Sequence, residues 1–196
     1  MLQFITQPEI KYSIAEQCQM VIEGSCGWIQ LHTSDIPEEH LQEVTTQIAE
    51  LCREAGIILV IEDNVDIAKK VGLHGVHITL HSGLSAHKIR PDFGPEMIIG
   101  IEVTDPQSIL SLQDADIDYI TLPKFLEDSR RKEIVDVAAM SGNILPVVFA
   151  GDYTSENVAK TLSDGASGVS TGHFINVVDN PVEYTSEMIR NLLTHE

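Results

Sequence analysis

The chain has 196 residues, of which 43% are hydrophobic and 21% are charged, and its formal net charge is −18. This length and composition fit one globular domain over residues 1–196. The negative charge argues against nucleic acid or an anionic membrane surface as a partner, because both would repel the chain. The longest apolar runs are far shorter than the ~20 residues that a membrane span needs.

Two features of the sequence favour a cytoplasmic location. The N-terminal segment lacks the basic start and the cleavage site of a signal peptide. The three cysteines, Cys18, Cys26 and Cys52, are odd in number and lack the spacing of metal ligands. We expect them to be buried, reduced thiols.

Eight short apolar segments follow one another along the chain and predict strands. They cover residues 2–6, 28–31, 57–61, 75–78, 97–101, 118–122, 145–149 and 168–171. Segments with helical spacing separate them, and the clearest is 38–55, where apolar side chains recur every three or four residues. Another helix is expected to begin in 153–162, with Thr154 or Ser155 as its cap. Gly56 directly follows the first of these helices, which is the usual stop signal.

The alternation of strands and helices predicts an α/β fold. Several strands are apolar almost throughout, which suits a parallel sheet that is covered on both faces. Eight strand–helix units fit a single (β/α)8 TIM barrel near the short end of its size range. A doubly wound open sheet is the alternative, but the first strand–helix turn lacks its G-x-G-x-x-G pattern.

In such barrels the ligand lies at the carboxyl ends of the strands, so the residues that follow each strand form the candidate site. In chain order these are Thr6 and Gln7; Gln30 and residues 32–34; residues 62–64; residues 79–82; residues 102–104; Pro123 and Lys124; Gly151 and Asp152; and Gly172 and His173.

The same strand-end stretches, taken in order over almost the whole chain, resemble the thiamine-phosphate synthase family, which includes a thiazole tautomerase branch. The segments are LQFIT (2–6), WIQL (28–31), VIEDNVDIAKKVGLHGVHI (60–78), MIIGI (97–101), DYITL (118–122), PVVFAGDYTSENVAKTLSDGASGVS (146–170) and DNPVE (179–183). The resemblance implies a barrel that couples hydroxymethylpyrimidine diphosphate with thiazole phosphate in thiamine biosynthesis. It also implies Mg²⁺ as cofactor, phosphorylated small molecules as substrates, and a homo-oligomer.

The resemblance implies roles for individual residues at the strand ends. The expected catalytic residues are Gln30, His32 and Lys124; the expected substrate-binding residues are Thr6, Gln30, Glu102, Gly151, Asp152, Gly172 and His173; and the expected metal ligand is Asp63, with Glu62 and His81 as further candidates. Glu62 is also expected to point away from Asp63, because neighbours along a strand alternate between its faces.

Several of the family's active-site groups are missing from this sequence. His32 and Ser34 stand where the family has an Arg and a Lys for the diphosphate, which replaces two fixed cations by a titratable ring and a hydroxyl. The second metal carboxylate has no counterpart in residues 79–82, and the lid after the sixth strand is replaced by a helix start at 127–133. Asp152 replaces a glycine beside the expected phosphate site. We therefore expect weaker coupling activity than the family implies.

Two other classes of function stay open. The His and carboxylate side chains on the rim could hold an unidentified divalent metal and serve a repurposed hydrolase or isomerase. The chain could also be a non-catalytic binding or regulatory paralogue that has no cofactor. We expect His77 to be a buried, hydrogen-bonded structural residue and Trp28 to be part of the core.

Overall fold

The computed structural model describes residues 1–8, 11–112, 114–140 and 145–194 of the chain. Eight parallel strands form a closed barrel in sequence order, from β1 to β8 and back to β1. The strands are β1 (Leu2–Ile5), β2 (Trp28–Leu31), β3 (Ile58–Glu62), β4 (Gly75–Ile78), β5 (Ile98–Glu102), β6 (Tyr119–Leu122), β7 (Val147–Ala150) and β8 (Gly168–Thr171). The predicted (β/α)8 barrel is confirmed.

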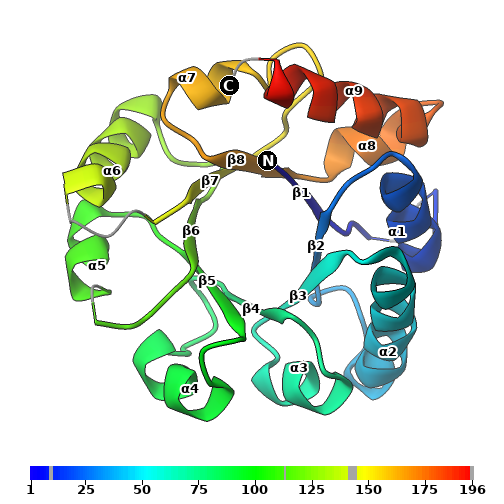
Figure 1. The fold of residues 1–196 in the computed structure, drawn as a ribbon, viewed down its shortest axis with the longest axis horizontal. Coiled ribbons are helices and arrows are strands. Elements are labelled where there is room, and N and C mark those ends of the chain that lie inside the picture. Colours follow the sequence, from blue (N-terminus) through cyan, green and yellow to red (C-terminus); the bar gives the residue numbers. More distant parts are fainter. Residues whose placement is uncertain (9–10, 113, 141–144, 195–196) are drawn as a thin grey trace.

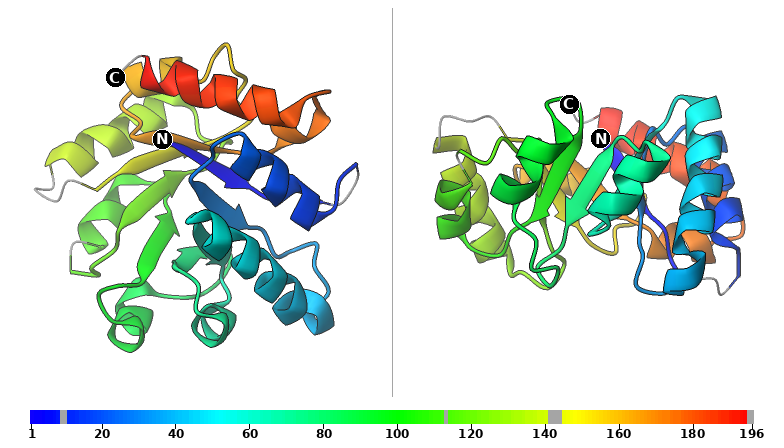
Figure 2. Two further views of the ribbon diagram at one scale, coloured as in Figure 1. Left: turned by 45° about the vertical axis from the view of Figure 1, so that its right-hand side comes forward. Right: turned by 90° about the horizontal axis from the view of Figure 1, so that it is seen from below.

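Helices surround the barrel on the outside, and their order follows the chain around the ring (Figure 1). In the described residues they are α1 (Ile14–Glu23), α2 (Glu38–Ala55), α3 (Val65–Val71), α4 (Ala86–Phe93), α5 (Pro106–Ser111), α6 (Asp128–Met140), α7 (Lys160–Ser163), α8 (His173–Val177) and α9 (Pro181–Leu193). The side views in Figure 2 show this layer of helices packed along the strands. No helix in the described ranges has the length and apolarity to cross a membrane.

The sequence predicted most element positions within two residues, and one prediction needs correction. The helix at 38–55 is confirmed as α2, and Gly56 ends it in the left-handed conformation. The helix expected to begin in 153–162 is reduced to turns followed by the four residues of α7. The backbone hydrogen bonds of this segment are mostly of the i to i+3 type, such as Lys160 N–H to the Asn157 oxygen and Thr161 N–H to the Val158 oxygen, so it forms successive turns before α7.

The apolar residues form two separate cores. The larger core lies between the outer faces of the strands and the helices, and its fully buried side chains include Phe4, Ile48 and Ile134. The smaller core fills the barrel lumen, where Trp28 packs edge-on against Tyr119 at a centroid distance of 4.7 Å. The prediction that Trp28 belongs to the core is confirmed.

A series of hydrogen-bonded polar side chains crosses the lumen and includes the hydroxyl of Tyr119. Ser170 donates to Gln3, Gln3 donates to the Tyr119 hydroxyl, and that hydroxyl lies 3.0 Å from His77 Nδ1. Burial lowers the pKa of His77 to about 4, so its ring is neutral near pH 7. The prediction of a buried, hydrogen-bonded His77 is confirmed. Gly100 makes room for this arrangement, because a Cβ there would lie 2.0 Å from Tyr119 Cζ.

The three cysteines are free and buried, as predicted. Burial is the largest cause of a raised pKa at each thiol, to about 11 at Cys26 and about 12 at Cys52. These thiols are therefore protonated near pH 7 and act as small apolar core residues.

Candidate functional site

A cavity of about 300 Å³ opens at the carboxyl ends of the strands, at the mouth of the barrel. We call it the mouth cavity. Its lining includes eight of the strand-end residues that the sequence singled out: Gln7, Glu102, Pro123, Lys124, Gly151, Asp152, Gly172 and His173. Five of the seven residues predicted to bind substrate are among them, whereas Thr6 and Gln30 are not, and all these roles stay predictions.

One ion pair lies at the exits of β6 and β7, on the edge of the mouth cavity. Lys124 Nζ lies 3.2 Å from Asp152 Oδ2, and both side chains are about half exposed or more, at 68% and 49%. Such an exposed pair contributes little to stability. Its consequence is electrostatic, because the positive charge of Lys124 offsets the negative charge of Asp152 at this edge of the cavity.

A second group of residues joins the exits of β2 and β3. Glu62 accepts a hydrogen bond from Gln30 Nε2 at 2.7 Å, and its other oxygen lies 2.6 Å from His32 Nδ1. Thr6 holds the adjacent backbone, because its hydroxyl accepts from the His32 N–H at 2.9 Å. We call Gln30, His32 and Glu62 the inner triad.

Two members of the inner triad, His32 and Glu62, form an ion pair when His32 is protonated. Glu62 is buried and His32 is half-buried. The side chain of Glu62 is 9% exposed and that of His32 is 32% exposed. The hydrogen bond to Glu62 is the main reason why the pKa of His32 is raised. Burial raises the pKa of Glu62, but the hydrogen bond and charge of His32 and the bond from Gln30 outweigh it, so the net pKa is lowered. The pair is therefore charged below the raised pKa of His32.

Glu62 points away from Asp63, as the alternation of strand residues predicts, and Glu62 is the one of the two that faces the lumen. It lies opposite His77 in the β3–β4 register, and it reaches the Gln30 side chain of β2. The pairing of His32 with Glu62 was missed, because 30 residues separate them and only the strand register brings them together.

Asp63 is turned toward the next strand end rather than into the lumen. Its two oxygens accept hydrogen bonds from the Thr79 N–H at 2.8 Å and the Thr79 hydroxyl at 2.6 Å. The backbone of Asp63 is left-handed, with φ at 56°, a conformation that Asp and Asn tolerate better than most residues. Asp63 thereby ties the β3 exit to the β4 exit.

The residues at these exits do not fit Mg²⁺ in this arrangement. A magnesium site needs carboxylate oxygens that are free to enter an octahedral shell. The oxygens of Glu62 and Asp63 are hydrogen-bonded to Gln30, His32 and the backbone N–H and hydroxyl of Thr79. Ser82 stands where the family resemblance implies the second carboxylate. No group of three or more His, Cys, Asp or Glu side chains in the described residues is placed to hold a metal ion. The metal roles of Asp63, Glu62 and His81 stay predictions.

Glu102 lies between the two parts of the mouth. It lines the mouth cavity and accepts a hydrogen bond from the Leu80 N–H at 3.2 Å. Burial is the main reason why its pKa is raised, and the nearby carboxylates Glu62 and Asp63 add to the effect. Glu102 thus takes up a proton more readily than an exposed glutamate does.

Comparison with known proteins places the chain in a family. The family model described as thiamine monophosphate synthase matches residues 2–175. The thiamine-phosphate synthase of Bacteroides thetaiotaomicron is 30% identical over 96% of this chain and 95% of its own, and that of Natronomonas pharaonis is 28% identical over 90% and 86%. The structure of a thiamine phosphate pyrophosphorylase from Pyrococcus furiosus covers 99% of this chain and 96% of its own with a TM-score of 0.84, at 20% identity, which bears on the fold. The chain belongs to the thiamine monophosphate synthase family.

Proposed function

We propose that this protein acts in thiamine biosynthesis as a diverged thiamine-phosphate synthase. It binds a phosphorylated thiamine precursor at the mouth of the barrel, and it couples hydroxymethylpyrimidine diphosphate with thiazole phosphate more slowly than its relatives do. We place this role in the cytoplasm, which the three free cysteines support. We also propose a homo-oligomer, which light scattering on the purified protein tests.

The mouth cavity supports the binding of a phosphorylated heterocycle. The exits of β7 and β8 form one side of it, where Gly151 and Gly172 lie beside Asp152 and His173. Lys124 supplies a cation at this wall, although it shares its charge with Asp152. A phosphate that enters here competes with Asp152 for Lys124, so binding is expected to be weaker than at a site with an unshared cation.

The inner triad is the observation that carries the proposal of slow coupling. The departure of diphosphate requires positive groups aimed at the charge that develops on it. At the β2 exit this chain offers His32, whose Nδ1 is already bonded to Glu62. The positive charge of His32 is thus compensated within the protein, and Ser34 adds no charge.

Calorimetric titration with thiazole phosphate tests the binding part of the proposal. We expect one equivalent to bind, and Lys124→Gln to weaken the binding about threefold to fivefold, which is the range for a partly shared surface charge. Lys88→Gln is the matched control, because it removes the same charge from an exposed position on α4. Equal affinities for the three proteins would place the phosphate elsewhere.

The inner triad also favours a second candidate, an isomerase that moves a proton on its substrate. Glu62 holds the ring of His32 through Nδ1 and stabilises its protonated form, which leaves Nε2 as the group that takes up and returns a proton. Nε2 lies 3.4 Å from the exposed Asp35, so it is on the solvent side of the ring. Incorporation of solvent deuterium into thiazole phosphate at equilibrium, lost in His32→Asn, would support this candidate.

A further inference from the structure

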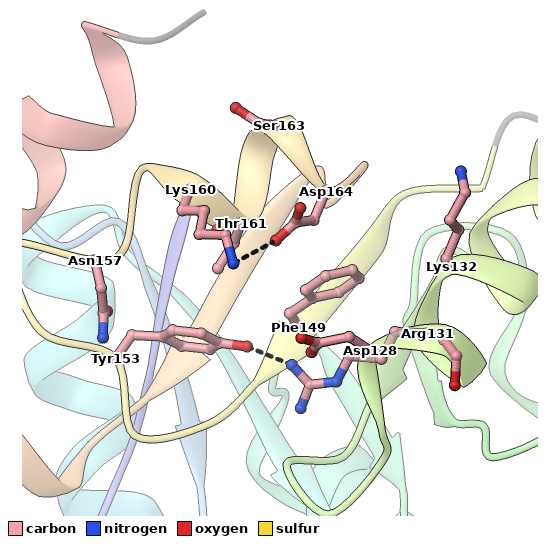
Figure 3. Close-up of a pocket in the computed structure, with 11 residues that line it drawn as sticks. Asp128, Arg131, Lys132, Phe149, Tyr153, Asn157, Lys160, Thr161, Ser163 and Asp164 are labelled. Carbon is pink, nitrogen blue, oxygen red and sulfur yellow. Dashed lines mark hydrogen bonds and ion pairs between the residues drawn. The ribbon is translucent and has the colours of Figure 1, made fainter.

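A second cavity lies outside the barrel, between α6 and the turn that leads into α7. Its volume is about 580 Å³, larger than that of the mouth cavity. Its lining comes from α6, from Phe149 of β7 and from residues 153–164. Figure 3 shows that Arg131 and Tyr153 meet along one side of it, with the Lys160–Asp164 pair opposite. We call it the outer cavity.

Arg131 is the most unusual residue of the outer cavity. Its guanidinium donates to the Tyr153 hydroxyl at 2.9 Å and to the carbonyl oxygens of Pro123 and Ala150 at 3.2 and 3.5 Å. A guanidinium has five N–H donors, so these three acceptors leave two donors unused. The Nε of Arg131 is buried without any partner.

Arg131 also lacks an ion-pair partner. No carboxylate of the described residues lies within 4.0 Å of its guanidinium, although Asp128 and Asp164 line the same cavity. The other two cations of the lining are paired, Lys132 with Asp136 at 3.6 Å and Lys160 with Asp164 at 4.0 Å. In a chain with a net charge of −18, a half-buried cation without an ion-pair partner is a local attraction for an anion, which Asp128 of the same lining partly opposes.

Aromatic side chains give the outer cavity an apolar part. The Arg131 guanidinium lies 5.3 Å from the centroid of the Phe149 ring, and Tyr153 stands beside it. Both rings line the cavity together with the amide of Asn157. The cavity thus combines an unsatisfied cation, ring faces and a hydrogen-bonding amide within a volume that suits a small metabolite.

We propose that the outer cavity is a binding site for a small anionic metabolite that carries a ring, with its phosphate or carboxylate on Arg131 and its ring against Tyr153. Lys160 adds a second positive group when the ligand anion displaces Asp164 from it. The site is separate from the mouth cavity, and the proposal does not depend on the proposed function.

Arg131 connects the outer cavity to the mouth cavity. The carbonyl groups that hold it belong to Pro123 and Ala150, and both residues line the mouth cavity. A ligand anion that binds the guanidinium is expected to weaken its hydrogen bonds to these carbonyl groups at the β6 and β7 exits. Occupancy of the outer cavity is therefore expected to change ligand affinity at the mouth cavity.

Titration with adenosine 5′-monophosphate as a ring-bearing anion, and with inorganic phosphate as the anion alone, tests the proposal. We expect the nucleotide to bind with a Kd below ~1 mM and phosphate to bind at least about tenfold more weakly. Arg131→Gln should abolish nucleotide binding. Because that change also removes structural hydrogen bonds, Lys160→Gln is the second variant, and it should weaken binding about threefold to fivefold without a change in the thermal unfolding temperature.

Two controls separate the outer cavity from other sites. Lys88→Gln removes an exposed charge from α4 and should leave nucleotide binding unchanged, and Lys124→Gln reports on the mouth. The NMR chemical shifts of the backbone amides of Tyr153 and Asn157 should change when the nucleotide is added. The proposal is overturned if no binding occurs up to ~10 mM nucleotide, if Lys160→Gln has no effect, or if Lys124→Gln weakens the binding instead.

Discussion

The contact between His32 and Glu62 predicts a coupling energy that depends on pH. The perturbations are His32→Ala, Glu62→Gln and the double variant, which together form a cycle that isolates the contact. A hydrogen bond to a charged group contributes about 1.5–3 kcal/mol. Because His32 is 32% exposed and solvent screens it, we take the low end of that range. The predicted coupling energy at pH 6 is about 1.5 kcal/mol.

The pH window follows from the direction of the two pKa shifts. The pKa of His32 is raised from 6.5, so its contribution is full below that value and fades as pH rises through the folded-state pKa. The pKa of Glu62 is lowered from 4.5, so its contribution is full above that value and fades as pH falls through the folded-state pKa. The coupling should therefore be largest between these two usual values, near pH 6, and should fall toward zero at alkaline pH.

Urea unfolding followed by circular dichroism measures the coupling at pH 6 and at pH 9. The control cycle pairs Glu62→Gln with His87→Ala, an exposed histidine of α4, and should give no coupling. A coupling below about 0.3 kcal/mol at pH 6, which is the usual error of additivity, would show that His32 and Glu62 do not stabilise each other. An equal coupling at both pH values would show that the contact is not charged.

Three further changes have expected outcomes. Gly100→Ala places a Cβ 2.0 Å from Tyr119 Cζ, so it should lower the unfolding free energy by about 2 kcal/mol or prevent folding, whereas Gly27→Ala, with open space around it, should not. In Asp63→Asn the new side chain tolerates the left-handed backbone, but the two hydrogen bonds from Thr79 become weaker. The free energy of unfolding, measured by thermal unfolding, should fall by about 1–2 kcal/mol. Glu102→Gln should stabilise the protein at pH 8 relative to pH 4, because a raised acid pKa costs stability once the folded group must ionise; an equal effect at both pH values would contradict this.

The barrel was predictable because its signal repeats along the chain. Each strand is a short apolar run, and α2 carries a long amphipathic pattern that ends at Gly56. The segment 153–162 could not be predicted as well, since its residue types allow a helix, whereas its backbone forms mostly i to i+3 bonds and only a short α7. The outer cavity beside α7 was not apparent from the sequence either.

The candidate site was predictable as a set of positions but not as a set of contacts. The rule that ligands lie at the carboxyl ends of barrel strands located Gly151, Asp152 and His173, which line one cavity. It did not reveal that Lys124 neutralises Asp152 or that His32 bonds to Glu62. Those contacts depend on strand register and side-chain direction, which residue types alone do not specify.

The rate of thiamine phosphate formation decides whether this protein is a slow synthase. Hydroxymethylpyrimidine diphosphate, thiazole phosphate and saturating Mg²⁺ are mixed with excess protein, beside the Bacteroides thetaiotaomicron relative under the same conditions. We predict a rate at least about 100-fold below that of the relative, the loss expected when the cationic groups on a leaving diphosphate are absent. We also predict that His32→Arg with Ser34→Lys recovers part of the rate. A wild-type rate within about tenfold of the relative would contradict the account.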